Sequence, residues 1–174
     1  MDKELVVVDQ HAAHERIGFE ILKDQLSKNK IEQQQLLIPE QVELHPKDAG
    51  YISENLEILN KVGIEIEPFG GNTFIIKALP ALLADSDMKG LVVKLAHDLS
   101  EFGDSSQTEE VIENILKTMA CHRQVRFGHS LALDEMKHLL NEMDKWPNTD
   151  RCPHGRPSFI KFDNTEIRKW FERM

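Results

Sequence analysis

The chain has 174 residues, a formal net charge of −9 at pH 7, 40% hydrophobic residues and two cysteines. This length suits one ordinary domain or two small subdomains, with enough apolar residues for a real core. No apolar run is long enough to span a bilayer and the start has no signal-peptide pattern, so a membrane protein is not expected. The acidic balance argues against strong autonomous binding to nucleic acid.

The first predicted elements are a buried strand over residues 4–8 and a helix over residues 12–26. The strand is rich in valine, and apolar residues recur on the helix at the spacing of one face. His11 and Glu15 fall on that apolar face, four residues apart. A buried carboxylate is costly unless it is paired or bound to a metal, so Glu15 is the strongest physical indication of a site. The solvated side of the helix is expected to hold His14, Arg16, Glu20 and Lys23.

The middle of the chain predicts an edge strand, a helix and a hairpin. Pro39 confines the extended segment to an edge, because proline donates no hydrogen bond to a neighbouring strand. Pro46 suits the first turn of a helix, and Gly63 ends that helix. The expected ranges are a polar linker over 27–35, an extended segment over 36–44, a helix over 46–61, and a hairpin of 64–66 with 73–76 across a turn at 69–72.

The last part of the chain predicts helices and one short strand. Glu109 and Glu110 follow the capping residue Thr108, where their charge suits the helix dipole. The expected ranges are a helix over 88–102, a loop over 103–107, a helix from Thr108 to near Cys121, a helix over 134–143, a loop over 146–157, a strand over 158–162 and a helix over 165–173.

Both cysteines stand beside histidines, in Cys121-His122 and in Cys152-Pro-His154. Thiolate and imidazole are ligands of transition metals, and zinc is the first candidate. Such cysteines, without a signal peptide, favour a reduced, cytoplasmic setting over a secreted disulfide. The candidate metal ligands are Asp9, His11, Glu15, Cys121, Cys152 and His154.

None of these candidate ligands falls in residues 33–104. The simplest organisation is an α+β fold with a discontinuous main subdomain, of about residues 1–32 with 105–174. A second subdomain of about residues 33–104 is then inserted in it.

Each candidate residue also has a structural interpretation that the sequence leaves open. Asp9 stands between a strand and a helix and suits an N-cap. His11 and Glu15 are also explained as a buried polar pair. The remaining alternatives are a small core residue for Cys121, a packed ring for His122, a surface turn for Cys152 with His154, and an electrostatic partner of the carboxylates for Arg156.

Together these motifs resemble the C-terminal domain of the MutL mismatch-repair family, in its endonuclease-bearing branch. Residues 9–20 match the first motif of that branch, DQHA followed by two residues, E, four residues and E. Residues 152–157, Cys-Pro-His-Gly-Arg-Pro, match its C-P-H-G-R-P motif without a departure. Residues 120–123, Ala-Cys-His-Arg, and residues 171–173, Phe-Glu-Arg, are similar to its second motif and its F-x-R ending. The resemblance covers nearly the whole chain.

The resemblance implies nicking of duplex DNA by metal-assisted hydrolysis of a phosphodiester. Asp9 and Glu15 would hold the divalent ion, and Arg156 would steady the negative charge of the phosphate. Mixed sulfur, nitrogen and oxygen ligands suit zinc, while manganese or magnesium would prefer the oxygens. The zinc or second-metal ligands would come from His11, Glu15, Cys121, Cys152 and His154. The resemblance also implies a homodimer formed through the main subdomain, a regulatory role for the insert, and an upstream ATPase half.

Residues 34–39, Gln-Gln-Leu-Leu-Ile-Pro, are similar to the Q-x-x-L-x-P motif through which such domains bind the replication sliding clamp. Gln34, Leu37 and Pro39 would form an exposed hook. A ring that encircles DNA would raise the effective concentration of an acidic domain that binds DNA weakly. The alternative is an edge strand that enters the insert.

Apolar residues at both ends of the chain predict a dimer surface. The last helix carries Ile167, Trp170 and Phe171, and the first helix has a second apolar edge at Ile17 and Ile21. One small core does not need two apolar edges on one helix, so one edge is expected to serve a partner subunit. The alternative is that Ile17 and Ile21 pack under the insert.

Two other functions remain open from the sequence. One is a dimerisation and clamp-docking module with a structural zinc and little nuclease activity. The other is a zinc hydrolase of small molecules, which would need a deep apolar pocket near Glu15. A closed site with four ligands favours structure, whereas an open metal position favours catalysis.

Overall fold

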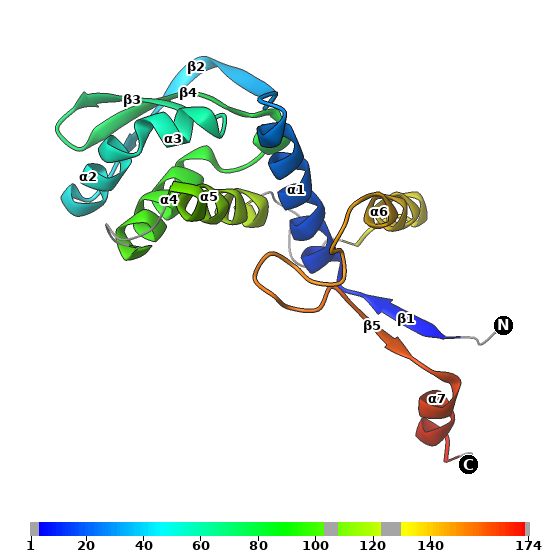
Figure 1. Cartoon of the computed structure of the whole chain (residues 1–174). Coiled ribbons are helices and arrows are strands. Elements are labelled where there is room, and N and C mark those ends of the chain that lie inside the picture. The colour runs from blue at the N-terminus through cyan, green and yellow to red at the C-terminus, as the bar shows by residue number, and fades with distance from the viewer. Residues whose placement is uncertain (1–3, 103–107, 123–129, 173–174) are drawn as a thin grey trace. The chain divides into compact units, whose positions relative to one another are not determined.

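The computed structural model describes residues 4–102, 108–122 and 130–172 (Figure 1). The predicted loop over 103–107, Arg123 of the second motif and Arg173 of the F-x-R ending lie outside these residues. The chain divides into two compact units, Met1–Ile17 with Val125–Met174 and Gly18–Gln124. Helices and sheets are mixed in an α+β fold, as the sequence predicts. The predicted subdomains have other bounds than these units and stay a prediction.

The first unit is built on a two-stranded antiparallel sheet. Its strands pair in a register that joins Leu5 to Phe162 and Val8 to Phe159. The elements are β1 (Leu5–Val8), the first turns of α1 (Gln10–Ser27), α6 (Leu133–Lys145), β5 (Phe159–Phe162) and α7 (Asn164–Trp170). The predicted helix over 165–173 is thus shorter at its end.

The expectation that the first strand is buried is wrong. Leu5, Val6 and Val7 are 43%, 46% and 47% exposed, and Ile160 on β5 is 48% exposed. Valine-rich composition predicts extended backbone, but a strand is buried only where another layer covers its face. Apolar side chains on this small sheet are therefore exposed in the part of a single chain that the structure describes.

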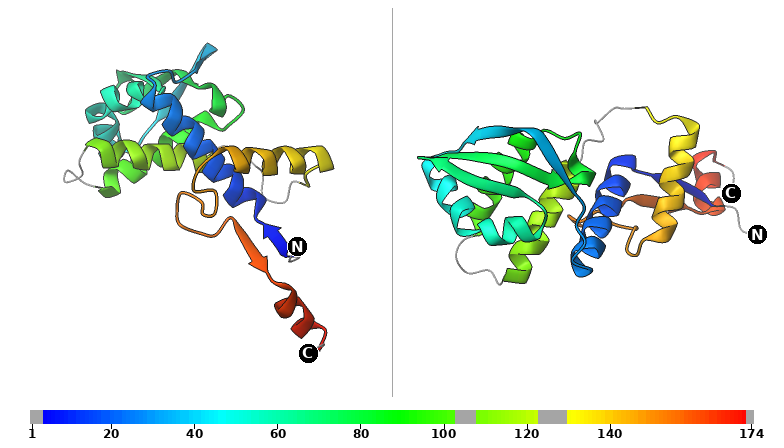
Figure 2. Two further views of the ribbon diagram at one scale, coloured as in Figure 1. Left: turned by 45° about the vertical axis from the view of Figure 1, so that its right-hand side comes forward. Right: turned by 90° about the horizontal axis from the view of Figure 1, so that it is seen from above.

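The second unit combines a three-stranded antiparallel sheet with helices (Figures 1 and 2). The order β2-β4-β3 puts β2 at an edge, which confirms the position expected from Pro39. The sheet comprises β2 (Gln33–Glu43), β3 (Glu65–Gly70) and β4 (Thr73–Pro80), and the helices are α2 (Pro46–Glu54), α3 (Leu56–Lys61), α4 (Met88–Phe102) and α5 (Thr108–His122), with a short 3-10 turn at Ala81–Leu83.

The helices of this unit cover one face of its sheet (Figure 1). Alternate residues Phe74, Ile76 and Ala78 of β4 are buried, as expected for a strand with one covered face. Phe74 and Ile76 join a hydrophobic core to which α1 also contributes Phe19 and Leu22. The core of the second unit thus holds the C-terminal half of α1 in place.

The single helix expected over 46–61 is two helices. Pro46 begins α2 as predicted, but the backbone leaves helical geometry at Asn55, with φ −110° and ψ 16°. The side chain of Asn55 donates to the carbonyl of Tyr51 at 2.8 Å. Asparagine competes in this way for backbone hydrogen bonds, so it favours a break within a helical pattern. Gly63 follows α3 with φ +89°, which confirms it as the stop.

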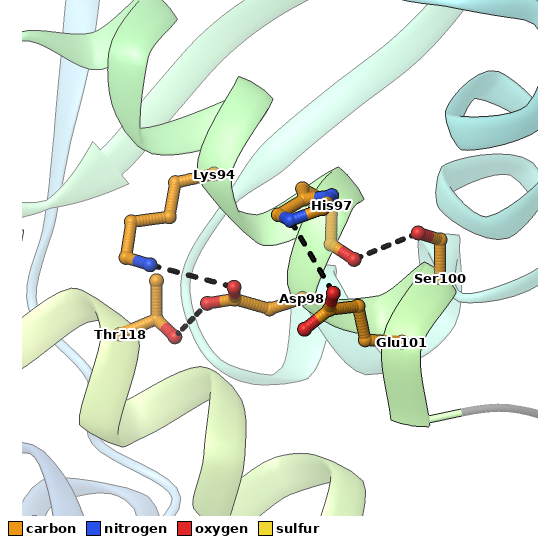
Figure 3. A network of polar contacts seen from close by, with 6 residues as sticks. All are labelled: Lys94, His97, Asp98, Ser100, Glu101 and Thr118. Atoms are coloured by element: carbon orange, nitrogen blue, oxygen red, sulfur yellow. Dashed lines mark hydrogen bonds and ion pairs between the residues drawn. The ribbon is translucent and has the colours of Figure 1, made fainter.

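Polar contacts tie α4 to α5 within the second unit (Figure 3). The Thr118 hydroxyl donates to Asp98 at 2.7 Å, and Lys94 pairs with the other oxygen of the same carboxylate at 3.4 Å. His97 lies 3.6 Å from Glu101 on the outer side of α4. Because Thr118 is buried, its hydroxyl needs this partner, and the pair fixes how the two helices pack.

Glu20 is buried, so the prediction that it is solvated is wrong. The consecutive residues Ile17, Gly18, Phe19 and Glu20 are all buried, so this stretch of α1 is covered on more than one side. Apolar periodicity detects a helix with one covered face and misjudges one that is enclosed.

Among the helices that the structure describes, none is long and apolar enough to cross a membrane.

Candidate metal centre

Strand pairing in the first unit brings the start of the first motif beside the C-P-H-G-R-P motif. Val8 and Phe159 are partners in the antiparallel sheet, so the residues after β1 and before β5 meet at the same end. The backbone N–H of Asp9 donates to the carbonyl of Ser158 at 2.8 Å. The start of α1 therefore lies beside residues 146–157, the Cys-Pro-His loop.

Asp9 caps α1. One of its carboxylate oxygens, Oδ1, accepts from the backbone N–H of His11 at 2.9 Å and of Ala12 at 3.2 Å. These bonds satisfy donors that the first turn of a helix leaves free. The N-cap alternative is thus correct for this oxygen, and the metal-binding and catalytic roles of Asp9 stay a prediction.

Glu15 and His11 face each other across one turn of α1. The His11 Nε2 atom lies 3.0 Å from Glu15 Oε1, and Glu15 is buried. The other ring nitrogen of His11, Nδ1, is buried without a hydrogen-bond partner among the residues that the structure describes. A buried polar atom of this kind calls for a ligand or a water molecule.

His154 comes to Glu15 from the Cys-Pro-His loop. A ligand nitrogen of His154 and a carboxylate oxygen of Glu15 lie within 4.8 Å of each other. Ligands stand about 2.0–2.2 Å from a zinc ion, so two ligands of one ion are separated by roughly 3–4 Å. A small movement of either side chain would let both bind the same ion.

The Cys-Pro-His loop is a tight turn closed by backbone bonds. The Cys152 N–H donates to the Arg156 carbonyl at 2.8 Å, and the Gly155 N–H donates to the Cys152 carbonyl at 2.9 Å. Gly155 has φ +87°, a conformation that a residue with a Cβ rarely adopts. Cys152 is buried and is not in a disulfide, whereas His154 and Arg156 are exposed.

Cys121 and His122 of the second motif belong to the second unit. Cys121 is half-buried near the end of α5 in the second unit, and it stays a predicted ligand. His122 Nε2 lies 2.7 Å from the carbonyl oxygen of Asp87, which engages its ring within that unit. The packed ring that the sequence offers as an alternative for His122 stays a prediction.

The donor set fits a transition metal. Glu15 offers carboxylate oxygen, His154 imidazole nitrogen, and Cys152 stands two residues from His154 with a thiol. Zinc accepts all three ligand types, whereas magnesium and manganese prefer the oxygen. The chemistry of these residues is therefore compatible with the cofactors that the sequence predicts.

A family model described as the MutL C terminal dimerisation domain matches residues 1–131. The chain belongs to this family. It is 41% identical over 172 residues to the DNA mismatch repair protein MutL of Syntrophotalea carbinolica, and 43% identical over 169 residues to that of Paramagnetospirillum magneticum. The MutL of Rickettsia akari is 41% identical over 170 residues. These alignments cover 97–99% of the chain but 27–28% of the relatives, so the chain spans about a quarter of their length.

Three residues that support the loop in this MutL-family domain were not singled out as functional from the sequence. Arg16 was expected on the solvated face, but its Nε donates to the Arg151 carbonyl at 2.6 Å. Arg151 in turn donates to the Gly155 carbonyl at 2.9 Å. Ser158 is buried and its hydroxyl donates to the Thr149 carbonyl. Periodicity carries no signal for such bonds to distant carbonyls.

A second candidate site of the MutL-family domain is the predicted hook on β2. Gln35 pairs with Ala78 and Glu40 with Ile76, so residues 36–39 stand opposite Lys77 alone and bulge from the strand. Leu37 and Ile38 are 101% and 81% exposed, while Leu36 packs against the core. Gln34 and Pro39 are exposed as well. The segment has the exposed, extended shape that a docking hook requires.

Proposed function

We propose that the chain is the metal-dependent nicking endonuclease domain of a mismatch-repair protein, and that it hydrolyses a phosphodiester of duplex DNA. The observation that carries the proposal is the approach of Glu15 and His154 to within 4.8 Å. A carboxylate and an imidazole from opposite ends of the sequence converge beside an orphaned nitrogen of His11. A buried polar atom without a hydrogen-bond partner calls for an explanation such as a bound ion or water molecule.

The proposed metal site draws on the first motif, the second motif and the C-P-H-G-R-P motif. Glu15 and His154 form its centre, and His11 and Cys152 adjoin them on α1 and on the Cys-Pro-His loop. Asp9 and Cys121 complete the proposed set, Asp9 with its remaining carboxylate oxygen and Cys121 with a thiolate. Zinc suits the sulfur and nitrogen ligands, and manganese or magnesium suits the carboxylates. A metal bound there would polarise a phosphate or supply an activated water.

The protein side chains orient the substrate and balance its charge. Arg156 is exposed at the turn of the loop, where its guanidinium is available to a phosphate oxygen. Glu15 Oε1 lies 3.0 Å from His11 Nε2, so His11 helps to hold the carboxyl group in place. Thiolate ligands must stay reduced, which fits a cytoplasmic protein.

The proposed partners follow from the charge and the exposed surfaces. A domain with net charge −9 binds DNA weakly by itself. Docking of Gln34, Leu37 and Pro39 on the sliding clamp would supply the missing effective concentration. The exposed sheet of the first unit suits a homodimer, and an upstream ATPase half would belong to the full-length protein.

The test is nicking of supercoiled plasmid by the chain with manganese, with and without loaded clamp. Glu15→Gln should reduce nicking at least about 100-fold, because it removes the charge that holds the metal. Glu57→Gln is the matched control, since Glu57 is exposed on α3 in the second unit and should leave nicking unchanged. Equal nicking by the wild type, Glu15→Gln and Glu57→Gln would overturn the proposal.

A second candidate function is a dimerisation and clamp-docking module with a structural zinc. The exposed hook and the exposed apolar sheet favour it, since exposed apolar residues are more typical of binding surfaces than of catalytic sites. The number of open metal positions separates the two functions. The test replaces zinc with cobalt and records the absorption spectrum. If the metal is only structural, the spectrum should indicate a closed site with four protein ligands, and added phosphate should not change it.

A further inference from the structure

The proposed metal site joins two elements that need to be held together. Glu15 stands on α1, while His154 stands on the Cys-Pro-His loop. The strand pairing fixes the end of this loop through the bond from the Asp9 N–H to the Ser158 carbonyl. Ser158 is six residues after Cys152, so its bond to Asp9 does not by itself fix the turn that bears the ligands.

Arg16 bonds to the other arm of the loop. Its Nε donates to the Arg151 carbonyl oxygen at 2.6 Å. Arg16 is the residue next to Glu15, so the bond runs from the helix turn that carries one ligand. Hydrogen bonds from a charged guanidinium are short and stronger than those between neutral groups.

The peptide that Arg16 holds is the one that enters Cys152. The Arg151 carbonyl and the Cys152 N–H belong to one planar peptide, and this N–H donates to the Arg156 carbonyl at 2.8 Å. The Arg151 guanidinium also donates across the turn to the Gly155 carbonyl at 2.9 Å. A displacement of Arg151 would therefore pass to both sides of the turn.

We propose that Arg16 is a positioning residue for this metal site. Its guanidinium fixes the loop that carries Cys152 and His154 against the helix turn that carries Glu15. The inference rests on the proposed function, because it needs that site to bind metal. With Arg16 in place the loop is ordered before the metal arrives, so less conformational entropy is lost on binding.

The direction in which metal affinity changes distinguishes two possible roles of Arg16, its charge and its hydrogen bond. A cation beside a metal site repels the metal, so loss of the charge alone should tighten metal binding. Loss of a positioning bond should weaken it, typically by about 10- to 100-fold for residues that orient ligands. The two roles of Arg16 thus predict opposite changes in affinity.

The experiment measures zinc affinity by competition with a chromophoric chelator in reducing buffer, and thermal unfolding with and without zinc. Arg16→Gln should weaken zinc binding about 10- to 100-fold and reduce the zinc-induced rise in Tm, with the Tm of the metal-free protein little changed. Arg16→Lys keeps the charge without the planar fork, so it should show an intermediate loss. Arg168→Gln, an exposed arginine on α7, is the control and should bind zinc like the wild type.

The outcomes separate the inference from the proposed function. Wild-type zinc binding with equal or tighter binding by Arg16→Gln would overturn the positioning role and leave the metal site standing. An equal fall in Tm for the metal-free and zinc-bound forms would make Arg16 a structural residue only and would also overturn it. If Arg16→Gln does not fold, Arg16→Lys decides by the same measurements. A wild-type chain that binds no zinc would overturn the site itself, and the positioning role with it.

Discussion

Asp9 serves α1 as an N-cap through one carboxylate oxygen, and this bond permits a clean test of its chemistry. Asparagine caps a helix as well as aspartate does but has no charge for a metal. We expect Asp9→Asn to keep the fold and the dimer, measured by circular dichroism and sedimentation, and to lose plasmid nicking. Nicking near the wild-type rate would show that Asp9 is a cap only. Asp9→Ala should additionally cost about 1 kcal/mol of stability.

Glu142 provides a pH-dependent contribution at the end of α6. The hydrogen bond from the Lys145 ammonium lowers the pKa of Glu142 below its usual value. A depressed pKa in the folded state contributes stability above the usual pKa, and this contribution disappears as the pH falls through the lowered value. We expect Glu142→Gln to lower the urea midpoint slightly at pH 7, and the difference from the wild type to shrink and vanish as the pH falls through the lowered pKa of Glu142. A difference that persists in acid would assign the effect to packing.

At the scale of residues, the sequence singles out candidate ligands but not the residues that support them. Cys152 and His154 stand out because cysteine and histidine at short spacing have few structural uses. Arg16 and Ser158 carry no such signal, since arginine and serine are common on surfaces. Their partners are backbone carbonyls of Arg151 and Thr149, and only the folded chain shows which carbonyls come within reach.

The stop after α3 depends on glycine. Gly63 has φ +89°, and a Cβ there would stand 2.6 Å from Ile31 Cγ2 and 3.1 Å from Pro80 Cγ. We expect Gly63→Ala to lower the free energy of unfolding by roughly 1–3 kcal/mol, measured in urea. Gly50, inside α2 with no atom near its Cβ position, is the control. Gly50→Ala should instead raise stability by about 0.5–1 kcal/mol, and equal effects of the two changes would contradict this account.

The hook on β2 should contribute to docking and not to folding. Leu37 is fully exposed, so its replacement removes no buried contact. We expect Gln34→Ala with Leu37→Ala to change the free energy of unfolding by less than about 0.5 kcal/mol and to leave clamp-independent nicking unchanged. Any stimulation by clamp should be lost, because a short peptide binds through a few anchors.

Leu36 provides the matched variant for this measurement. It packs against the core beside the hook, so Leu36→Ala should destabilise the chain while Leu37→Ala does not. Stimulation of the double variant equal to that of the wild type would show that residues 34–39 are only an edge strand.

At the scale of elements, periodicity and turn residues predict most of the fold. The ranges of α4 and β5 agree with the sequence to within a residue, and Pro46 and Gly63 mark the ends where they were expected. The break at Asn55 and the exposure of β1 were not predicted. Each depends on something outside the local pattern, a side-chain bond in the first case and the absence of a covering layer in the second.

At the scale of the whole molecule, the exposed sheet indicates where two copies would meet. Val7 and Ile160 are partners in the register, so they lie on the same face, and Leu5 and Phe162 continue this face. The ring of Trp170 packs edge-on against that of Phe162, with the ring centroids 4.8 Å apart, and Trp170 is itself 57% exposed. By contrast Ile17 is buried within the chain, which leaves it unavailable to a partner.

This apolar face leads to a prediction about assembly. We expect the wild-type chain to sediment as a dimer at micromolar concentration, and Val7→Glu to shift it toward the 20.0 kDa monomer. A carboxylate buried without a partner in an interface is costly, so the dimer should weaken by roughly 100-fold or more. Val93→Glu is the control, because Val93 is 46% exposed on α4, close to the 47% of Val7, but lies in the second unit. A wild-type monomer, or equal weakening by both variants, would contradict a dimer through β1 and β5.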